Sequence, residues 1–161
     1  MALFTSFNIS ASGMTAQQLR TDVIAQNIAN ADTTRTSDGT AYVKKNVVFT
    51  EKTLTGTALG KKASVYQSYS SFADALRMAN GGIVGNGVKV TSIYEDTNTD
   101  MNIVYDPSHP DADENGYVTY PNVNVVQEMT DLIDASRSYE ANISAFNAAK
   151  TMAQKGLTIG E

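Results

Sequence analysis

The chain of 161 residues contains no cysteine, no tryptophan and only three prolines, and it has no long run of strongly apolar residues. Without cysteine it can form neither disulfides nor thiolate metal sites, and it has no cysteine nucleophile. Without about 18 consecutive apolar residues it has no segment suited to crossing a bilayer, so we expect no membrane insertion of its own. Its net charge of −5 argues against nucleic acid as a partner, because phosphate binding needs a basic surface.

Strongly apolar side chains are also scarce. Leu, Ile, Val and Phe make up about 21% of the residues, close to the roughly 20% below which chains tend towards disorder. The 19 alanines count as hydrophobic but bury little area, and burial stabilises a fold in proportion to apolar area. The length is that of a single domain, and we expect this domain to depend on partners for part of its stability.

The N-terminal segment, residues 1–31, has no proline and few charges, and it is predicted to form a long helix. Projected at 100° per residue, its apolar residues form two nearly opposite faces, with Phe7 and Met14 on one and Leu19 and Val23 on the other. A helix at the surface of a domain needs only one apolar face, so two faces indicate contacts on both sides. A buried core helix of an ordinary domain is the alternative interpretation.

The C-terminal segment, residues 122–161, is predicted to be a second long helix with a heptad-type seam. Asn124 is suited to cap its N-terminus, and the seam positions then recur at alternating spacings of four and three. The seam consists of Val125, Met129, Leu132, Ser136, Tyr139, Ile143, Phe146, Lys150, Ala153 and Leu157. The carboxylates of Glu128, Asp131 and Asp134 lie outside the seam and are interpreted as a solvated face. We expect this helix to pair with the N-terminal helix as an antiparallel coiled coil.

The middle of the chain, residues 32–121, holds all three prolines and most of the glycines, and it is predicted to be a β-rich region. A period-two pattern after the turn-forming pair Asn86-Gly87 predicts a strand over residues 88–94. Further predictions are strands over Tyr42–Phe49, Met101–Tyr105 and Tyr117–Tyr120, an extended arm over residues 50–69 and a short helix over residues 71–80. The predicted fold class is therefore α+β.

One acidic loop resembles half of a metal site. Asp111, Asp113, Asn115 and Gly116 match the first half of a calcium-binding loop, with the pattern D-x-D-x-N-G. The twelfth position is Asn122, where such loops carry a bidentate glutamate, and a strand is predicted where the loop would lead into a helix. The sequence therefore favours a solvated turn over this weak calcium candidate, and no cofactor is expected.

The only histidine, His109, lies between two prolines. With Ser108 and nearby carboxylates it could in principle serve as a general base. However, no G-x-S-x-G or other catalytic motif accompanies it, and the glycines of residues 81–87 do not complete a phosphate-binding loop. The sequence therefore predicts a non-enzymatic protein, with His109 in a rigid turn.

Two motifs carry a resemblance to a known family. The segment Asn27-Ile28-Ala29-Asn30-Ala31-Asp32-Thr33 resembles the N-x-A-N-x-x-T signature that closes the first helix of bacterial flagellar rod and hook proteins. Residues 105–123 look like a segment specific to one proximal rod protein, and residues 125–146 are similar to the terminal helix of the family. The residues of this chain that match the family motifs are Asn27, Ala29, Asn30, Thr33, Asp106, Pro107, His109 and Pro110.

This resemblance implies a structural, self-assembling subunit of the flagellar basal-body rod, on the periplasmic side of the inner membrane after synthesis in the cytoplasm. It implies export in an unfolded state through the flagellar type III apparatus, and terminal helices that fold on assembly around a central export channel. Residues 1–31 and 122–161 would then form the two halves of an inner helical domain, and residues 32–121 an outer β-rich layer. The implied partners are other copies of this chain, other flagellar rod proteins and the export apparatus.

The residues expected at the assembly interface lie on the two helices. They are Phe7, Met14, Leu19, Ile28, Met129, Leu132, Tyr139, Ile143 and Phe146, and we expect those of the second helix to pack against those of the first. The alternative function is a cell-wall or calcium-dependent binding module carried by the middle β region. A peptidoglycan hydrolase that uses Asp106 or His109 is a further alternative.

Overall fold

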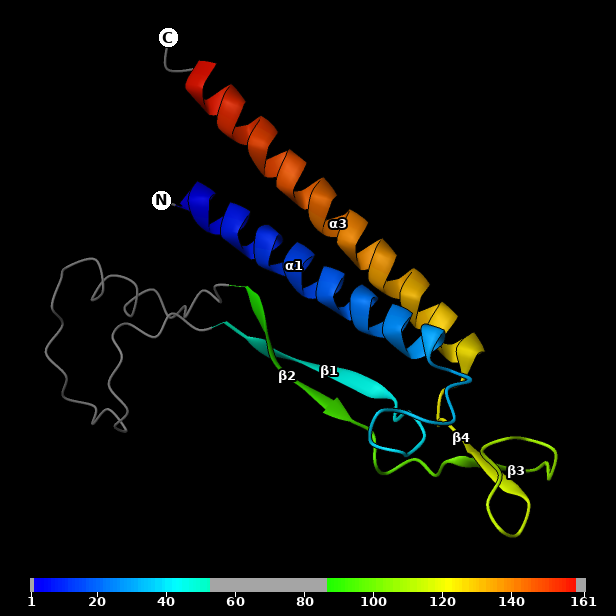
Figure 1. The fold of residues 1–161 in the computed structure, drawn as a ribbon. Coiled ribbons are helices and arrows are strands. Elements are labelled where there is room, and N and C mark those ends of the chain that lie inside the picture. Colours follow the sequence, from blue (N-terminus) through cyan, green and yellow to red (C-terminus); the bar gives the residue numbers. More distant parts are fainter. Residues whose placement is uncertain (1, 53–86, 159–161) are drawn as a thin grey trace, which may run out of the picture.

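A computed structural model describes residues 2–52 and 87–158 of the chain. The elements follow in the order α1 (Ala2–Ala29), β1 (Lys45–Glu51), β2 (Val88–Glu95), β3 (Asn102–Tyr105), β4 (Tyr117–Tyr120) and α3 (Val125–Thr158) (Figure 1). Two long terminal helices with short antiparallel strands between them confirm the predicted α+β class. Thr50 and Glu51, the first residues of the arm predicted over residues 50–69, belong to β1, whereas the rest of the arm beyond residue 52 and the short helix predicted over residues 71–80 lie outside the described residues.

Helix α1 lies in the middle of the molecule, with α3 on one side and the β1–β2 hairpin on the other (Figure 1). The two helices run antiparallel, so both ends of the chain lie at one end of the pair. The β3–β4 hairpin lies beyond the opposite end, where α1 ends and α3 begins. The contacts on both sides of α1 confirm what its two apolar faces predicted.

The strands form two separate antiparallel pairs. In the first, Lys45 lies opposite Glu95, and the register shifts once further along between Val48 and Phe49. In the second, Asn102 lies opposite Tyr120. All four predicted strands are present, although β1 begins three residues later than predicted. The N–H of Tyr42 donates instead to the carbonyl of Thr33, which places this residue in a loop closed against the end of α1.

A glycine allows the first hairpin to lie close against α1. Gly87 has a φ of 100°, which L side chains rarely adopt, and a Cβ there would overlap the side chain of Ser12 and lie 3.2 Å from the Cα of Ile9. The next residue, Val88, donates its N–H to the Ser12 hydroxyl over 3.1 Å. Gly87 therefore serves as the point where the start of β2 meets the helix.

Helix α3 begins as predicted, with the Asn124 side chain accepting hydrogen bonds from the N–H groups of Val126 and Gln127 at 3.1 and 3.3 Å. It continues through Gly156, which was expected near its end. Among its 34 residues only Glu128, Ala135 and Ala149 are buried. Most of this helix is therefore left for contacts that the single chain does not make.

The stripe that α3 turns towards α1 differs from the predicted seam. Every second seam position is partly buried, namely Leu132, Tyr139, Phe146 and Ala153, whereas the others are exposed, namely Val125, Met129, Ser136, Ile143, Lys150 and Leu157. The inward stripe alternates the first four with Glu128, Ala135, Asn142 and Ala149, again at spacings of four and three. Met129 and Ile143, which were expected to pack against α1, are 54% and 37% exposed, and Glu128 and Asn142 beside them belong to the inward stripe.

Candidate functional site

The two helices approach closely through small side chains. The rings of Phe7 and Phe146 meet edge to face with centroids 4.9 Å apart, so these two predicted interface residues pack together within one chain. Two turns along α1, a Cβ on Gly13 would lie only 2.6 to 2.9 Å from the side-chain amide of Asn142. Gly13 therefore sets how near α3 can come to α1.

A buried asparagine closes the other end of the helix pair. The Asn27 side chain is 1% exposed, and its amide donates to the carbonyl of Lys45 at 2.9 Å and to Glu128 Oε2 at 3.0 Å. Its oxygen accepts from the Tyr42 hydroxyl at 2.9 Å and from the N–H of Lys45 at 3.0 Å. All four hydrogen-bonding positions of the amide are thus used, which joins α1, α3 and the start of β1.

An ion pair lies next to this asparagine. Glu128 is 1% exposed, and its Oε1 lies 2.6 Å from Lys44 Nζ. The interpretation of Glu128 as part of a solvated face is therefore wrong. Burial, reinforced by the carboxylates of Glu95 and Glu128, raises the pKa of the Tyr42 phenol, so this hydroxyl stays protonated as a donor to Asn27. The ammonium of Lys44, whose side chain is 20% exposed, compensates the charge of the buried Glu128 carboxylate.

A second asparagine ties the same point to the segment that leads into α3. Asn122 accepts from the N–H of Lys44 at 2.9 Å and donates to the carbonyls of Asp96 and Thr99 at 2.8 and 3.2 Å. The N–H of Asp96 in turn donates to the Lys44 carbonyl. We refer to the side chains that meet here, Asn27, Tyr42, Lys44, Asn122 and Glu128, as the junction cluster.

The sequence identified only one member of the junction cluster as a candidate functional residue. Asn27 belongs to the family motif, and its amide satisfies the backbone N–H and carbonyl of Lys45 at the start of β1. Asn30, from the same motif, donates to the carbonyl of Gln26 and accepts from the Thr33 hydroxyl at the end of α1. The seven-residue spacing between Glu128 and Ala135 could have indicated that both lie on the same face of the helix. A glutamate among small residues is, however, ordinarily solvated.

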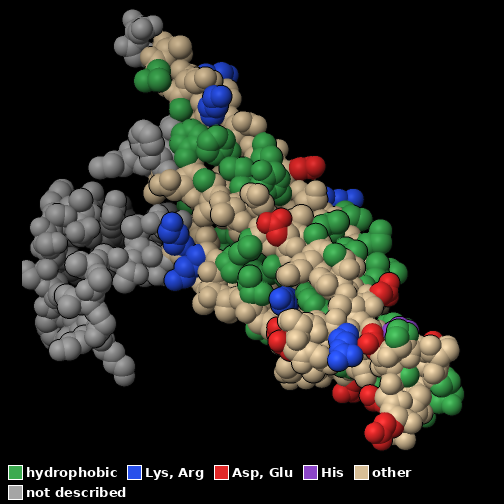
Figure 2. Space-filling view, viewed as in Figure 1, with side chains coloured by type: hydrophobic (Ala, Val, Ile, Leu, Met, Phe, Trp, Pro, Cys, Tyr) green, Lys and Arg blue, Asp and Glu red, His purple; other side chains and the backbone are tan. Residues whose placement is uncertain are grey.

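The opposite side of α3 carries a group of exposed apolar residues. Val126, Met129 and Ile133 are 75%, 54% and 52% exposed, and Val125 and Ile143 lie at the edge of this group. Figure 2 shows apolar side chains in several patches along α3. We refer to these five residues as the outer face. It contains two of the predicted interface residues, Met129 and Ile143.

The side chains around His109 form hydrogen bonds that hold the chain in a turn. Asp106 accepts hydrogen bonds from the hydroxyl and the N–H of Ser108 at 2.6 and 3.0 Å, and these bonds lower the pKa of its carboxyl. The Nδ1 of His109 accepts from the N–H of Asp111, and its ring lies against Tyr120. The Ser108 hydroxyl therefore donates to Asp106, and this arrangement is a turn rather than a Ser-His pair.

The acidic loop uses its first carboxylate within the fold. Asp111 accepts from the Thr34 hydroxyl at 2.8 Å and lies 3.7 Å from the Arg35 guanidinium. Within residues 2–52 and 87–158, no three carboxylate or imidazole groups gather as metal ligands would. The loop instead attaches the β3–β4 hairpin to the turn that follows α1.

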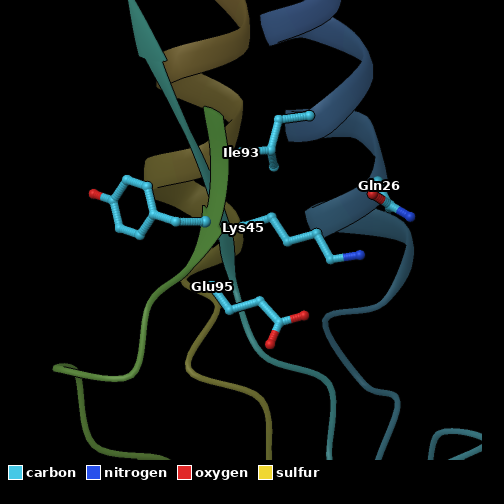
Figure 3. A pocket seen from close by; sticks show the side chains of 5 residues that line it. Gln26, Lys45, Ile93 and Glu95 are labelled. Atoms are coloured by element: carbon cyan, nitrogen blue, oxygen red, sulfur yellow. The ribbon is translucent and has the colours of Figure 1, made fainter. Parts of the chain in front are cut away.

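A shallow hollow of about 510 Å³ lies between α1 and the first hairpin, lined by Gln26, Lys45, Ile93, Tyr94 and Glu95. Figure 3 shows Lys45 and Glu95 reaching from the paired strands towards the side on which Gln26 of α1 lies. The hollow is wide open, and Ile93 is the only residue of its lining without a polar group in its side chain, whereas pockets that enclose small molecules are mostly apolar. Across the part of the chain that the structure describes, no helix is both long and apolar enough to span a membrane.

Comparisons with known proteins agree with the resemblance in the sequence. Residues 7–35 match the model of the family described as flagella basal body rod protein, and residues 114–159 match the C-terminal domain of flagellar basal body rod FlgEFG proteins. The chain is 44% identical to the flagellar basal-body rod protein FlgC of Bacillus subtilis over the whole of both chains. It is 41% identical to FlgC of Borreliella burgdorferi, over 99% of this chain and 98% of that one, and 40% identical to FlgC of Salmonella typhimurium over the whole of both. The chain therefore belongs to the FlgC family of flagellar basal-body rod proteins.

Proposed function

We propose that this chain is a non-enzymatic structural subunit of the flagellar basal-body rod and that the outer face of α3 is a main contact with neighbouring subunits. One observation carries the proposal. Met129 and Ile133 are exposed on the side of α3 away from α1, whereas the buried residues of this helix are Glu128 and two alanines. A helix of a self-sufficient domain has the opposite arrangement, with its apolar face inward.

We propose further that α1 and α3 form an antiparallel coiled coil. Gly13 lies against Asn142 and Asn27 against Glu128, and the two pairs are separated by 14 residues on both helices. A contact between the two helices therefore recurs after two heptads, as expected of helices that wind around each other with a 3.5-residue repeat.

The chain then divides into an inner and an outer part. Residues 1–31 and 122–161 would form the inner helical domain around the export channel, and residues 32–121 the outer β-rich region. The position of α1 between α3 and the first hairpin supports this division. The partners in the rod would be other copies of this chain and other flagellar rod proteins.

Folding of the helices would be completed by assembly. Because α3 buries only three of its residues within the subunit, neighbouring chains would supply much of the surface that stabilises it. A chain that is weakly folded on its own also suits export in an unfolded state through the flagellar type III apparatus.

The proposal is tested by placing a charge on the outer face. Met129→Asp would bring an unpaired carboxylate into the subunit contact, where burying a charge is costly. We expect motility in soft agar, and recovery of the subunit in isolated basal bodies, to fall about ten-fold or more when this variant is the only copy in the cell.

The matched control is Gln127→Asp, which adds the same charge two residues earlier, at an exposed polar position about 160° around the helix from Met129. We expect this variant to assemble and swim nearly as the parent does. Normal swimming of the Met129→Asp cells, with the variant recovered in their basal bodies, would overturn the assignment of the outer face.

A further inference from the structure

The inward stripe of α3 carries little that distinguishes one axial position from the next. Asn142 lies against Gly13, and the residues one heptad to either side of it are Ala135 and Ala149, which are also small and face α1. A shift of α3 by one heptad would therefore still place a small residue against Gly13. In one direction of shift, Tyr139 would replace Phe146 near Phe7, so an aromatic contact could also persist.

The junction cluster distinguishes these positions, because its partners come from outside the helix pair. Lys44 is held by its backbone, which accepts from the N–H of Asp96 and donates to Asn122. Glu128 reaches its ammonium only when α3 lies where it does in this structure. After a shift of one heptad the Glu128 carboxylate would lose both Lys44 and Asn27.

An ion pair with no buried member does not give the same discrimination. Arg20 and Asp131 also connect the helices, at 3.2 Å, but their side chains are 32% and 29% exposed. Water can replace either partner there, whereas a charge left unpaired in a buried position is strongly destabilising.

We infer that the junction cluster, and not the packing seam, sets the axial register of α3 on α1, with the ion pair between the buried Glu128 and Lys44 as its main determinant. The same contacts fix where the hairpins leave the helix pair, since Asn122 and Lys44 belong to the segments that lead to α3 and β1. Polar groups buried among apolar contacts are known to specify register in helix pairs at some cost in stability.

The absence of native cysteine makes this inference testable by disulfide trapping. The pair G13C and N142C reports the observed register, and the pairs G13C with A135C or A149C report a shift of one heptad in either direction. Each pair is placed in the full chain, and oxidation within isolated basal bodies is followed by non-reducing gel electrophoresis, which separates intrachain from interchain bonds by mass. The measurement in basal bodies rests on the proposed function. If the chain is not a rod subunit, the reporter chain without further substitutions will already be absent from the basal bodies.

The decisive variant replaces both charges, K44L with E128L, so that neither is left unpaired and packing volume is largely kept. We expect the ratio of shifted to native cross-links to rise about ten-fold over the parent, and to rise further when N122A is added. The matched control, R20L with D131L, removes the ion pair between Arg20 and Asp131. It should leave the ratio of shifted to native cross-links unchanged.

Native cross-links alone in both the double and the triple variant would overturn the inference. A change of helix register must be distinguished from a failure to enter the rod. The variants are therefore co-expressed with an unmodified copy, so that each rod needs to contain only a minority of variant chains. A K44L and E128L chain that is absent from basal bodies even then would also count against the inference, which holds that the pair specifies register rather than stability.

Discussion

The two faces of α3 differ in a way that is unusual for a helix of a small protein. The face towards α1 buries Glu128, Ala135 and Ala149, and the face away from it exposes Val126, Met129 and Ile133. The inward face is narrow and holds the helices close, because small residues allow the backbones to approach. The outward face leaves its apolar side chains exposed in the single chain, so the free energy of their burial becomes available only between subunits. The inward face therefore defines the shape of the subunit and the outward face its tendency to assemble.

The largest effect on the inward face should come from removing its buried charge. Glu128→Ala leaves Lys44 without its partner and removes one acceptor from Asn27. We expect a loss of about 3–5 kcal/mol in the free energy of unfolding, measured by thermal denaturation of the helices with circular dichroism. Glu140→Ala changes an exposed glutamate on the same helix and should cost far less. Equal losses in the two variants would contradict the role given to the inward face.

The glycines of the two helices should respond with opposite signs. Gly13→Ala puts a Cβ against the amide of Asn142 and should destabilise the subunit by about 1–3 kcal/mol. Gly156→Ala, in the same measurement, meets nothing within 4 Å and should stabilise α3 by up to about 1 kcal/mol. Destabilisation by both alanines would mean that the close approach at Gly13 is not what limits the helix spacing.

A smaller effect is expected for the buried phenol beside the inward face. Tyr42→Phe removes the hydroxyl that donates to Asn27 and should cost about 1 kcal/mol at neutral pH. Because folding raises the pKa of this phenol, its contribution is fully present below the ordinary value of 10.0 and is lost as pH rises through the folded value. The phenylalanine variant should therefore lose less stability than the parent above pH 10, whereas Tyr94→Phe, at an exposed site, should not.

The smallest effect on the subunit itself should come from the outward face. Ile133→Ser removes an exposed apolar side chain, so we expect the free energy of unfolding to change by no more than about 0.5 kcal/mol. The same variant should reduce the recovery of the chain in basal bodies, because the lost area is buried only there. A large loss of stability in the purified chain would place Ile133 in the fold of the subunit and weaken the contrast between the faces.

Local features of the structure followed from local sequence. The cap at Asn124, the four strands and the two long helices were all predicted, because each depends on neighbours within a few residues. The contacts of α1 on both sides were also predicted, since two apolar faces on one helix need two partners.

The junction cluster was largely missed for the opposite reason. Its members come from four segments that are far apart in the sequence, the end of α1, the residues before β1, the residues before α3 and the first turn of α3. Apart from the seven-residue spacing between Glu128 and Ala135, nothing in the nearby sequence marks Glu128 as buried or Lys44 as its partner, and isolated charged residues are ordinarily solvated. Only the meeting of these segments gives each charge its partner.

The sequence alone determined the family, the pair of long helices and a 4-3 repeat along the second of them. It did not determine which stripe of that repeat faces α1, because the predicted seam and the observed one share every second position. The remaining positions differ. In the predicted seam they are Met129, Ser136 and Ile143, and in the observed stripe they are Glu128, Ala135 and Asn142. The tertiary structure decided this point: the glycine at position 13 admits a close neighbour, and Asn27 with Lys44 provides the partners that a buried Glu128 requires.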